Sequence, residues 1–187
     1  MKKLLLVLAL VALVVTSAFA GEVLQNPGFE SGVLGPWYTA RTQFCGYTCV
    51  PWDVTSTFSH SGLYGATDVG NLELRQDFAP TPGSSITDVS FWVYGVGANA
   101  VDFFYSDGSD QEFVTFPAPG VWSHMDVTSD VDTSRILTGF SIWGTDPSAT
   151  TYVDDASITA TPEPGTLVML GSGIIGLAGI LRRKINL

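Results

Sequence analysis

The chain has 187 residues, of which 45% are hydrophobic, 12% aromatic and 14% charged, and its formal net charge is −10. This length and composition favour one folded domain over a disordered chain. Five of the eight basic residues lie at the two ends, so residues 21–161 carry 17 carboxylates against three arginines, Arg41, Arg75 and Arg135. Because nucleic-acid binding needs basic side chains against phosphates, the composition argues against nucleic acid as a partner.

Residues 1–20 have the three-part pattern of a secretory signal peptide. A basic start, Lys2-Lys3, precedes 12 apolar residues at positions 4–15. A helix of that length reaches only about 18 Å, which is too short for a hydrocarbon core of about 30 Å. Small residues then occupy the positions that signal peptidase reads. We therefore expect signal peptidase as a partner and a cleavage site formed by Ala18, Ala20 and Gly21.

Residues 21–160 lack a convincing amphipathic helix and contain short runs rich in aromatic and β-branched residues. Such runs, separated by turn residues, predict β-strands. An Asp-Gly turn at 106–110 predicts a hairpin, and Pro80 and Pro82 are expected between strands. Short strands without helical crossovers predict an all-β antiparallel sandwich, specifically a jelly roll. The clearest runs are Asp88–Tyr94, Val101–Tyr105, Gln111–Phe116, Ser123–Val127, Leu137–Trp143 and Tyr152–Thr159.

Residues 161–187 have a helix-breaking spacer, an apolar segment and a basic end. The triplet Pro162-Glu163-Pro164 lies in the spacer, and Leu167–Leu181 runs 15 residues without a charge. As a transmembrane helix this segment would reach about 22 Å, and its glycines make it a weak membrane anchor. The cluster Arg182, Arg183 and Lys184 would hold its end in the cytoplasm.

The order and spacing of these tail features resemble the PEP-CTERM sorting signal. The resemblance covers about the last 26 residues, from Pro162 onward. It implies a Gram-negative bacterium that makes exopolysaccharide, and it implies exosortase, a membrane transpeptidase-like enzyme, as a partner that cleaves near Pro162-Glu163-Pro164. The expected route leads through the inner membrane to the cell surface, the outer envelope or the extracellular biofilm matrix.

The middle domain resembles galactose-binding-like and carbohydrate-binding-module-like jelly rolls. The opening Asn26–Gly32 followed by Gly35-Pro36-Trp37 carries the resemblance, as do the turn His60–Gly65 and the strand Leu74–Phe78. Ser90–Val93 and Tyr152–Ile158 continue the pattern in order. The resemblance implies a sandwich fold and a glycan as the ligand.

The same resemblance implies a structural Ca²⁺ where the first and last strands meet. Its ligands would come from Glu30, Asp154 and Asp155, and carboxylate oxygens suit calcium chemically. The alternative is that these are solvated carboxylates at strand ends. On a regular strand, Asp154 and Asp155 point to opposite faces, so they could not flank one glycosidic bond.

Cys45 and Cys49 are the only cysteines. An even count in an exported chain favours a disulfide between them. A redox or metal pair is the alternative, but the redox motif has two intervening residues rather than three, and no further His or Cys lies nearby to complete a zinc site.

Aromatic side chains are the candidates for a sugar-binding surface. Alternation places Trp92 and Tyr94 on one face of their strand, and it likewise separates Trp143 from its neighbours. Tyr47 and Trp52 could form a rim near the cysteine loop. The alternative is that these rings fill the core, as we expect for Trp37 and Trp122.

The sequence contains no Gly-x-Ser-x-Gly elbow, no His-Glu-x-x-His motif and only two histidines, His60 and His124. We therefore expect a non-catalytic envelope or matrix protein with a structural or adhesive role that involves exopolysaccharide, and without a required cofactor. A dedicated carbohydrate-binding module is the first alternative, and a secreted enzyme acting on glycosides is the second.

Overall fold

The computed structural model describes residues 20–40, 49–95, 97–161 and 171–176. Glu22–Ala160 form one compact unit, and the two ends of the chain belong to another. Residues 171–176 are helical. Within the described ranges, no helix has the length and apolar character needed to cross a membrane. The predicted signal peptide before Ala20, the Pro162-Glu163-Pro164 triplet and the basic end lie outside the described residues.

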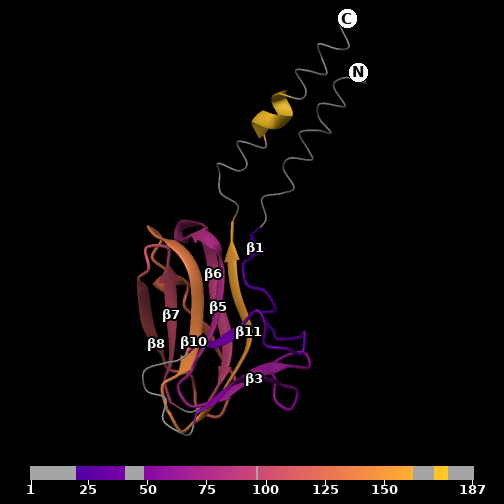
Figure 1. Ribbon diagram of the computed structural model, residues 1–187, viewed down its shortest axis with the longest axis vertical. Coiled ribbons are helices and arrows are strands. Elements are labelled where there is room, and N and C mark those ends of the chain that lie inside the picture. The colour runs from indigo at the N-terminus through magenta and orange to yellow at the C-terminus, as the bar shows by residue number, and fades with distance from the viewer. Residues whose placement is uncertain (1–19, 41–48, 96, 162–170, 177–187) are drawn as a thin grey trace, which may run out of the picture. The chain divides into compact units, whose positions relative to one another are not determined.

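The compact unit consists of two antiparallel β-sheets packed face to face (Figure 1). Sheet A has the strand order β3-β4-β11-β6-β9, with β1 paired to β11, and sheet B has the order β2-β5-β10-β7-β8. The predicted antiparallel sandwich is confirmed. Sheet A comprises β1 (Gly21–Glu22), β3 (Val50–Thr55), β4 (Gly65–Val69), β6 (Ile86–Tyr94), β9 (Ser123–Asp126) and β11 (Thr150–Ala160). Sheet B comprises β2 (Tyr38–Ala40), β5 (Glu73–Pro82), β7 (Asn99–Tyr105), β8 (Asp110–Thr115) and β10 (Ile136–Gly144), and 3-10 turns lie at Gly83–Ser85 and Thr128–Asp130.

The core lies between the two sheets and is filled by alternate residues of the central strands. Phe91 of β6 contacts Phe140 of β10, with ring centroids 6.3 Å apart, and Phe140 also packs on Phe103 of β7 at 5.6 Å. All three side chains are fully buried. Because side chains alternate along a strand, the residues between them point to the outer faces of the sandwich, and those faces are where a ligand could bind.

All six predicted strand runs are strands, with ends displaced by at most two residues. The prolines differ from expectation, since Pro80 and Pro82 lie inside β5 rather than between strands. The register explains why the strand tolerates them. Among the described strands, β2 pairs with β5 only over Glu73–Arg75, so β10 is the only described partner of the second half of β5 and the other edge needs no N–H donor.

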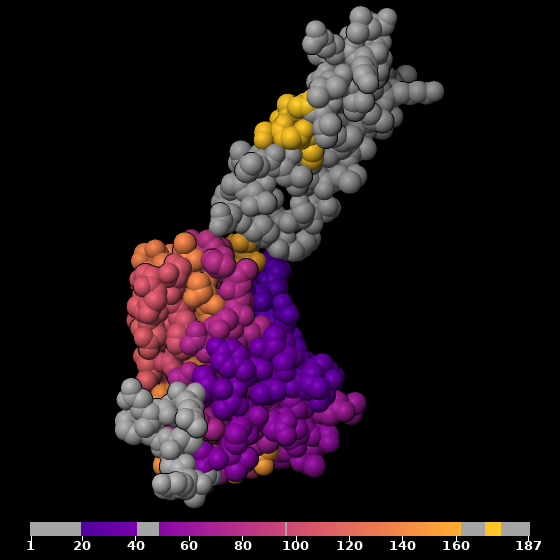
Figure 2. Space-filling model, viewed as in Figure 1, coloured from indigo at the N-terminus to yellow at the C-terminus, as the bar shows by residue number. Residues whose placement is uncertain are grey.

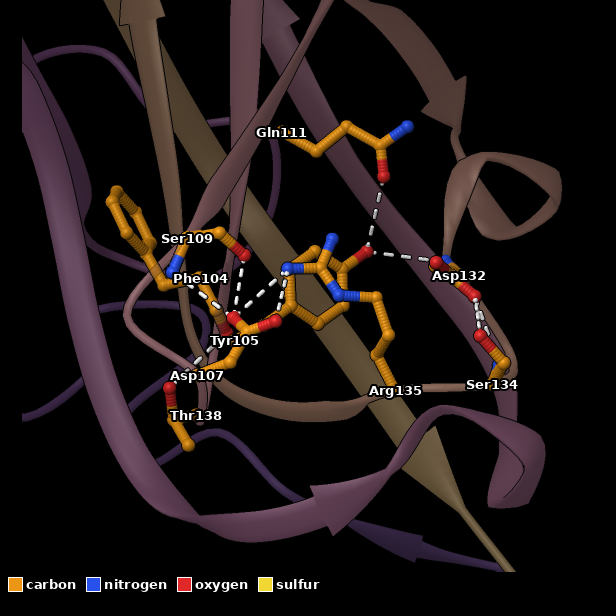
Figure 3. A network of polar contacts seen from close by, with 9 residues as sticks. All are labelled: Phe104, Tyr105, Asp107, Ser109, Gln111, Asp132, Ser134, Arg135 and Thr138. Atoms are coloured by element: carbon orange, nitrogen blue, oxygen red, sulfur yellow. Dashed lines mark hydrogen bonds and ion pairs between the residues drawn. The ribbon is translucent and has the colours of Figure 1, made fainter.

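A polar clamp holds the predicted hairpin between β7 and β8 (Figure 3). The Arg135 guanidinium lies over the Tyr105 ring, 3.7 Å from its centroid, and its Nη2 is 3.0 Å from Asp107 Oδ1. The Asp132 backbone N–H donates to the Tyr105 hydroxyl at 3.1 Å. Gly108 takes the positive φ of 82° that the turn requires. The clamp therefore fixes one end of sheet B.

Candidate functional site

The outer face of sheet A is aromatic. Trp92 and Tyr94 of β6 point outward, as alternation predicts, and Tyr152 of β11 pairs beside Tyr94. His124 of β9 pairs with Trp92. Phe58 and His60, between β3 and β4, and Trp122, between β8 and β9, contact the same rings. We call this surface the aromatic face, which consists of Phe58, His60, Trp92, Tyr94, Trp122, His124 and Tyr152.

The rings of the aromatic face pack against one another. His60 stacks on Trp92, with centroids 3.7 Å apart and ring planes 13° apart. Phe58 stacks on Trp122 at 5.5 Å and contacts both Tyr94 and Tyr152 at 4.7 Å. Such ring pairs contribute about 0.5–1.5 kcal/mol each beyond the area they bury. The flat surfaces that a sugar would need are therefore largely occupied by neighbouring rings. Trp122, which we expected in the core, belongs to this outer layer.

The outer face of sheet B has a different chemistry, which follows from its strand register. One row across the sheet places Trp143 beside Ala100 and Val114. The next rows carry most of the polar groups. We call this surface the acidic face, which consists of Tyr38, Glu73, Arg75, Asp77, Ala100, Asp102, Phe104, Asp110, Glu112, Val114, Gly139, Ser141 and Trp143. Tyr38 and Val114 are 39% and 48% exposed, so the face is accessible at both edges of the sheet.

Asp102 lies at the centre of the acidic face and is 4% exposed. Its Oδ2 accepts hydrogen bonds from Trp143 Nε1 at 3.1 Å and from Ser141 Oγ at 3.3 Å. Burial raises the pKa of Asp102 to about 6, although the Trp143 hydrogen bond opposes the rise. Burial also raises the pKa of Glu73 to about 7, and the nearby Asp102 adds to the rise. Both carboxyls are thus poorly solvated, and burial disfavours their charged forms.

Among the described residues of the acidic face, Arg75 is the only cation, and its guanidinium is already engaged. Its Nη2 lies 2.7 Å from Asp77 Oδ1, and its Cζ lies 3.6 Å from the centroid of the Phe104 ring. The Tyr38 hydroxyl donates to Asp77 Oδ2 at 2.8 Å, and the pKa of Tyr38 rises to about 12 because of burial and this hydrogen bond. Arg75 therefore offsets only part of the negative charge around Asp102 and Glu73.

The side chains of the acidic face have the chemistry that a polar, ring-shaped ligand would need. Carboxylate oxygens accept hydrogen bonds from hydroxyl or amino groups, and the half-buried indole of Trp143 offers an apolar surface beside them. Trp143 was predicted as a ligand residue, whereas Asp102, Glu73 and Glu112 were not. No motif marked them: Glu112 faces Asp102 across the β7–β8 hairpin, whereas Glu73 and Trp143 come near Asp102 only through the pairing of strands that are distant in sequence.

The three carboxylates expected to bind calcium lie around the turn at residues 60–64, which belongs to the purple stretch beside the indigo residues 20–40 in Figure 2. Asp154 Oδ2 accepts from the backbone N–H groups of His60 and Ser61, at 2.8 and 3.1 Å. Glu30 accepts from the N–H groups of Leu63 and Tyr64. These bonds join the N-terminal segment, the turn and the last strand.

A bulge brings Asp155 to the same turn. The register of β11 shifts after Asp154, and Asp155 has a φ of 46°, so the two adjacent carboxylates do not point to opposite faces as a regular strand would require. Asp155 Oδ1 accepts from Ser61 Oγ at 2.9 Å. In the part of the chain that is described, no three His, Cys, Asp or Glu side chains converge as a metal cluster, and these carboxylates are already bonded to protein donors. Calcium stays a prediction.

The remaining predicted residues lie elsewhere. Trp52 is in the core, 4% exposed, and its Nε1 donates to Leu72 O at 2.6 Å, so its ring cannot stack on a ligand. Trp37 is also in the core, as expected. Cys49 is disulfide-bonded, while Cys45 and Tyr47 lie outside the described residues.

Sequence reasoning did not single out Asp68 of β4. This side chain is 2% exposed, and neither of its oxygens accepts a hydrogen bond within the described ranges. Burial raises the pKa of Asp68 to about 8, and the N–H groups of Leu72 and Thr151 face the carboxyl and offset part of that rise. An isolated Asp within a strand gives no sequence signal for such burial.

Residues 160–184 match the PEP-CTERM protein-sorting motif. The chain therefore carries this motif, which marks an exported protein that is sorted by way of the membrane and implies processing by exosortase. The match confirms the sorting signal inferred from the Pro162-Glu163-Pro164 triplet. None of the curated proteins compared with the chain matches it.

Solved structures show which fold the compact unit shares. The chain is similar to TmCBM61 in complex with beta-1,4-galactotriose, at 22% identity and a TM-score of 0.54, over 75% of this chain and 99% of the other. It is similar to a family 16 carbohydrate-binding module at 17% identity and a TM-score of 0.51, over 73% and 98% of the two chains. It also resembles 21% of the enzymatically active domain of tailspike protein 4 from bacteriophage CBA120, at 8% identity and a TM-score of 0.55 over 75% of this chain. At these identities the likeness establishes the sandwich fold of carbohydrate-binding modules.

Proposed function

We propose that this chain is a non-catalytic glycan-binding protein of the bacterial cell surface or biofilm matrix, and that it holds exopolysaccharide on the acidic face. The observation that carries the proposal is the pairing of Trp143 with Asp102. The indole is fixed at its Nε1 by a buried carboxylate, so both groups are preorganised beside small residues of the central strands, Ser141 and Ala100. Preorganisation lowers the entropy cost of binding.

The chemistry of a pyranose fits this arrangement. Its C–H groups pack on an indole surface, and its hydroxyl groups donate to carboxylate oxygens. The aromatic face is the weaker candidate because its rings already contact one another. The sandwich fold shared with carbohydrate-binding modules supports the proposal at the level of the fold.

We test glycan binding with the purified full chain, in mild detergent, on an array of neutral and charged polysaccharides. Binding is expected, with loss in Trp143→Ala and Asp102→Asn and retention in the matched aromatic-face variant Tyr94→Ala. Loss in Tyr94→Ala with retention in Trp143→Ala would move the site to sheet A. The absence of any bound glycan would overturn the proposal.

The proposed route to the surface begins with signal peptidase, which cleaves before Gly21, and ends with exosortase, which cleaves near Pro162-Glu163-Pro164. In a host with exosortase, mass analysis of the surface form is expected to show a chain that starts at Gly21 and lacks residues beyond about 165. Replacing the triplet by three alanines is expected to leave a longer chain in the inner membrane. Normal trimming of that variant would contradict the route.

A further inference from the structure

The edge strands of a sandwich can pair with another chain, because half of their backbone N–H and C=O groups have no partner within the sheet. Natural edges are usually protected by shortness, prolines or bulges. Most of the described edges are protected in these ways. β1, β2 and β9 have two, three and four residues, β3 contains Pro51 and a register shift, and the free half of β5 contains Pro80 and Pro82.

Strand β8 lacks this protection. It lies at the margin of sheet B, with β7 as its only neighbour among the described strands (Figure 1). Its six residues include no proline, and its pairing with β7 runs without a register shift from Asp110 to Thr115. Val114 is 48% exposed, and Phe116, directly after the strand, is 80% exposed. We call the side of Asp110–Thr115 that faces away from β7 the open edge.

The hairpin between β7 and β8 determines which backbone groups face the open edge. The Tyr105 N–H donates to Ser109 O at 2.9 Å, so these two opposite residues form a hydrogen-bonded pair. Hydrogen-bonded and non-hydrogen-bonded pairs alternate along an antiparallel ladder. The odd-numbered residues of β8 are therefore bonded to β7, and the N–H and C=O groups of Glu112 and Val114 point to the open edge. Another strand would find donors and acceptors there.

The side chains of β8 are compatible with a second copy of the same strand. An antiparallel pair with its twofold axis at Phe113 places Glu112 opposite Val114 of the copy. Gln111 is then opposite Thr115 of the copy. An axis at Glu112 would overlap equally but would set two Glu112 carboxylates directly opposite each other, which is destabilising. The charges of β8 therefore favour the register centred on Phe113.

Phe113 adds an apolar contact to this register. Its side chain lies on the inner side of sheet B, where it is half-buried and packs on Phe103 with ring centroids 5.9 Å apart. At the axis, Phe113 and its copy form a non-hydrogen-bonded pair, the kind in which opposite side chains approach most closely. Each ring can therefore cover the part of the other that a single copy leaves exposed.

We infer that two copies of this chain form a twofold dimer in which β8 pairs antiparallel with β8 of the copy about Phe113. The axis is perpendicular to the sheet, because the inner sides of both strands must stay on the side of the core. The two acidic faces then lie on the same side and form one surface across the axis. A polysaccharide bound on both faces would gain affinity from multivalency. The dimer itself does not depend on the proposed glycan binding.

Sedimentation velocity of the full chain, in mild detergent and without glycan, measures the association. We expect a monomer–dimer equilibrium that is severalfold tighter in about 0.5 M salt than in about 0.05 M salt, because the two Glu112 carboxylates are diagonal neighbours and salt screens their repulsion. Val114→Pro removes an outward N–H and no bond to β7, so it is expected to stay monomeric. The matched control Val114→Thr keeps the N–H and the branched shape, and it is expected to dimerise. Association that persists in Val114→Pro, or a wild type that stays monomeric, overturns the inference.

Cysteine cross-linking tests the register and does not depend on whether Val114→Pro folds. Phe113→Cys would set two thiols opposite each other, within the Cα separation of about 4.4–6.8 Å that a disulfide needs, and we expect a covalent dimer on a non-reducing gel. In the matched variant Glu112→Cys the two cysteines would be diagonal neighbours about 7–8 Å apart, so we expect no cross-link. A cross-link in Glu112→Cys but not in Phe113→Cys would contradict the register.

The dimer and the proposed function fail in distinguishable ways. Glycan binding by a chain that stays monomeric overturns the dimer and leaves the proposed function in place. A dimer that binds no glycan overturns the proposed function alone.

Discussion

The two outer faces of the sandwich are built from the same kind of strand but differ in what their side chains contact. The aromatic face holds seven rings, which contact one another across β6, β9, β11 and the segments that cover them. The acidic face holds fewer rings, and its central groups, Trp143 and Asp102, are fixed to each other at a surface that stays accessible at its edges. A count of aromatic residues alone would favour sheet A as the ligand-binding sheet.

The difference shows that an aromatic ring indicates a binding surface only when other rings leave it uncovered. Trp92 stacks on His60, so one surface of its half-buried ring is occupied by the chain itself. Trp143 instead has a carboxylate at its edge, and its partner on β7 is the small residue Ala100. We first test a buried carboxylate of the interior and then separate the roles of the two outer faces.

The largest expected effect comes from the interior. Because the pKa of Asp68 is raised to about 8 in the folded state, the protonated form stabilises the fold below the unfolded pKa of about 4, and that contribution is lost as the pH rises through 8. The loss is about 5 kcal/mol over this range. Asp68→Asn is expected to match the wild type near pH 4 and to exceed its stability at pH 9 in urea unfolding. Parallel pH profiles for the two chains would show that Asp68 is solvated.

The next effect tests the structural role of the aromatic face. Trp92→Ala removes a ring that lies between His60 and His124, and we expect it to lower the free energy of unfolding by about 3 kcal/mol. Glycan binding by the chain that remains folded should be unchanged. Urea unfolding and titration at low temperature measure the two quantities. Lost binding with unchanged stability would reverse the roles assigned to the two faces.

Calcium provides a third test, because the turn at 60–64 both covers Trp92 and bonds the predicted ligands. If calcium bridges Glu30 to Asp154 or Asp155, calcium at a hundred times its Kd should add about 2.7 kcal/mol to the free energy of unfolding. The melting temperature of the full chain would then rise from chelator to millimolar calcium, and Glu30→Gln would remove most of the rise. Identical melting curves in chelator and in calcium would identify these groups as carboxylates bonded only to the protein.

The smallest expected effect on stability, and the decisive one for binding, comes from Trp143→Ala. Since the ring is half-buried at the surface of sheet B, we expect a loss of about 1 kcal/mol in unfolding free energy and at least a tenfold loss in glycan affinity, or about 1.4 kcal/mol. Titration at a temperature where both chains are fully folded measures the second quantity. Unchanged affinity would exclude Trp143 from the site.

The sequence alone was enough to predict the sorting motif and most of the sandwich. The Pro162-Glu163-Pro164 triplet, the apolar segment and the basic end are contiguous, so no tertiary contact is needed to recognise them. The six strand runs follow from local alternation, which is also why Trp92 and Tyr94 were placed on one side of β6 correctly. The short strands β2 and β3 and the prolines within β5 gave no such periodic signal.

Only the tertiary structure shows which of these surfaces is covered by rings of the chain itself. Alternation separates the two sides of a strand but does not show whether the outer side is covered. Phe58 and Trp122 cover sheet A from connecting segments, whose sequences have no periodic pattern. The bulge at Asp155 directs the Asp154 and Asp155 carboxylates to one turn, although a regular strand would point them to opposite faces. Strand register, finally, set Asp102 beside Trp143, across 41 positions of sequence. Such contacts depend on the pairing of distant strands, which local chemistry does not encode.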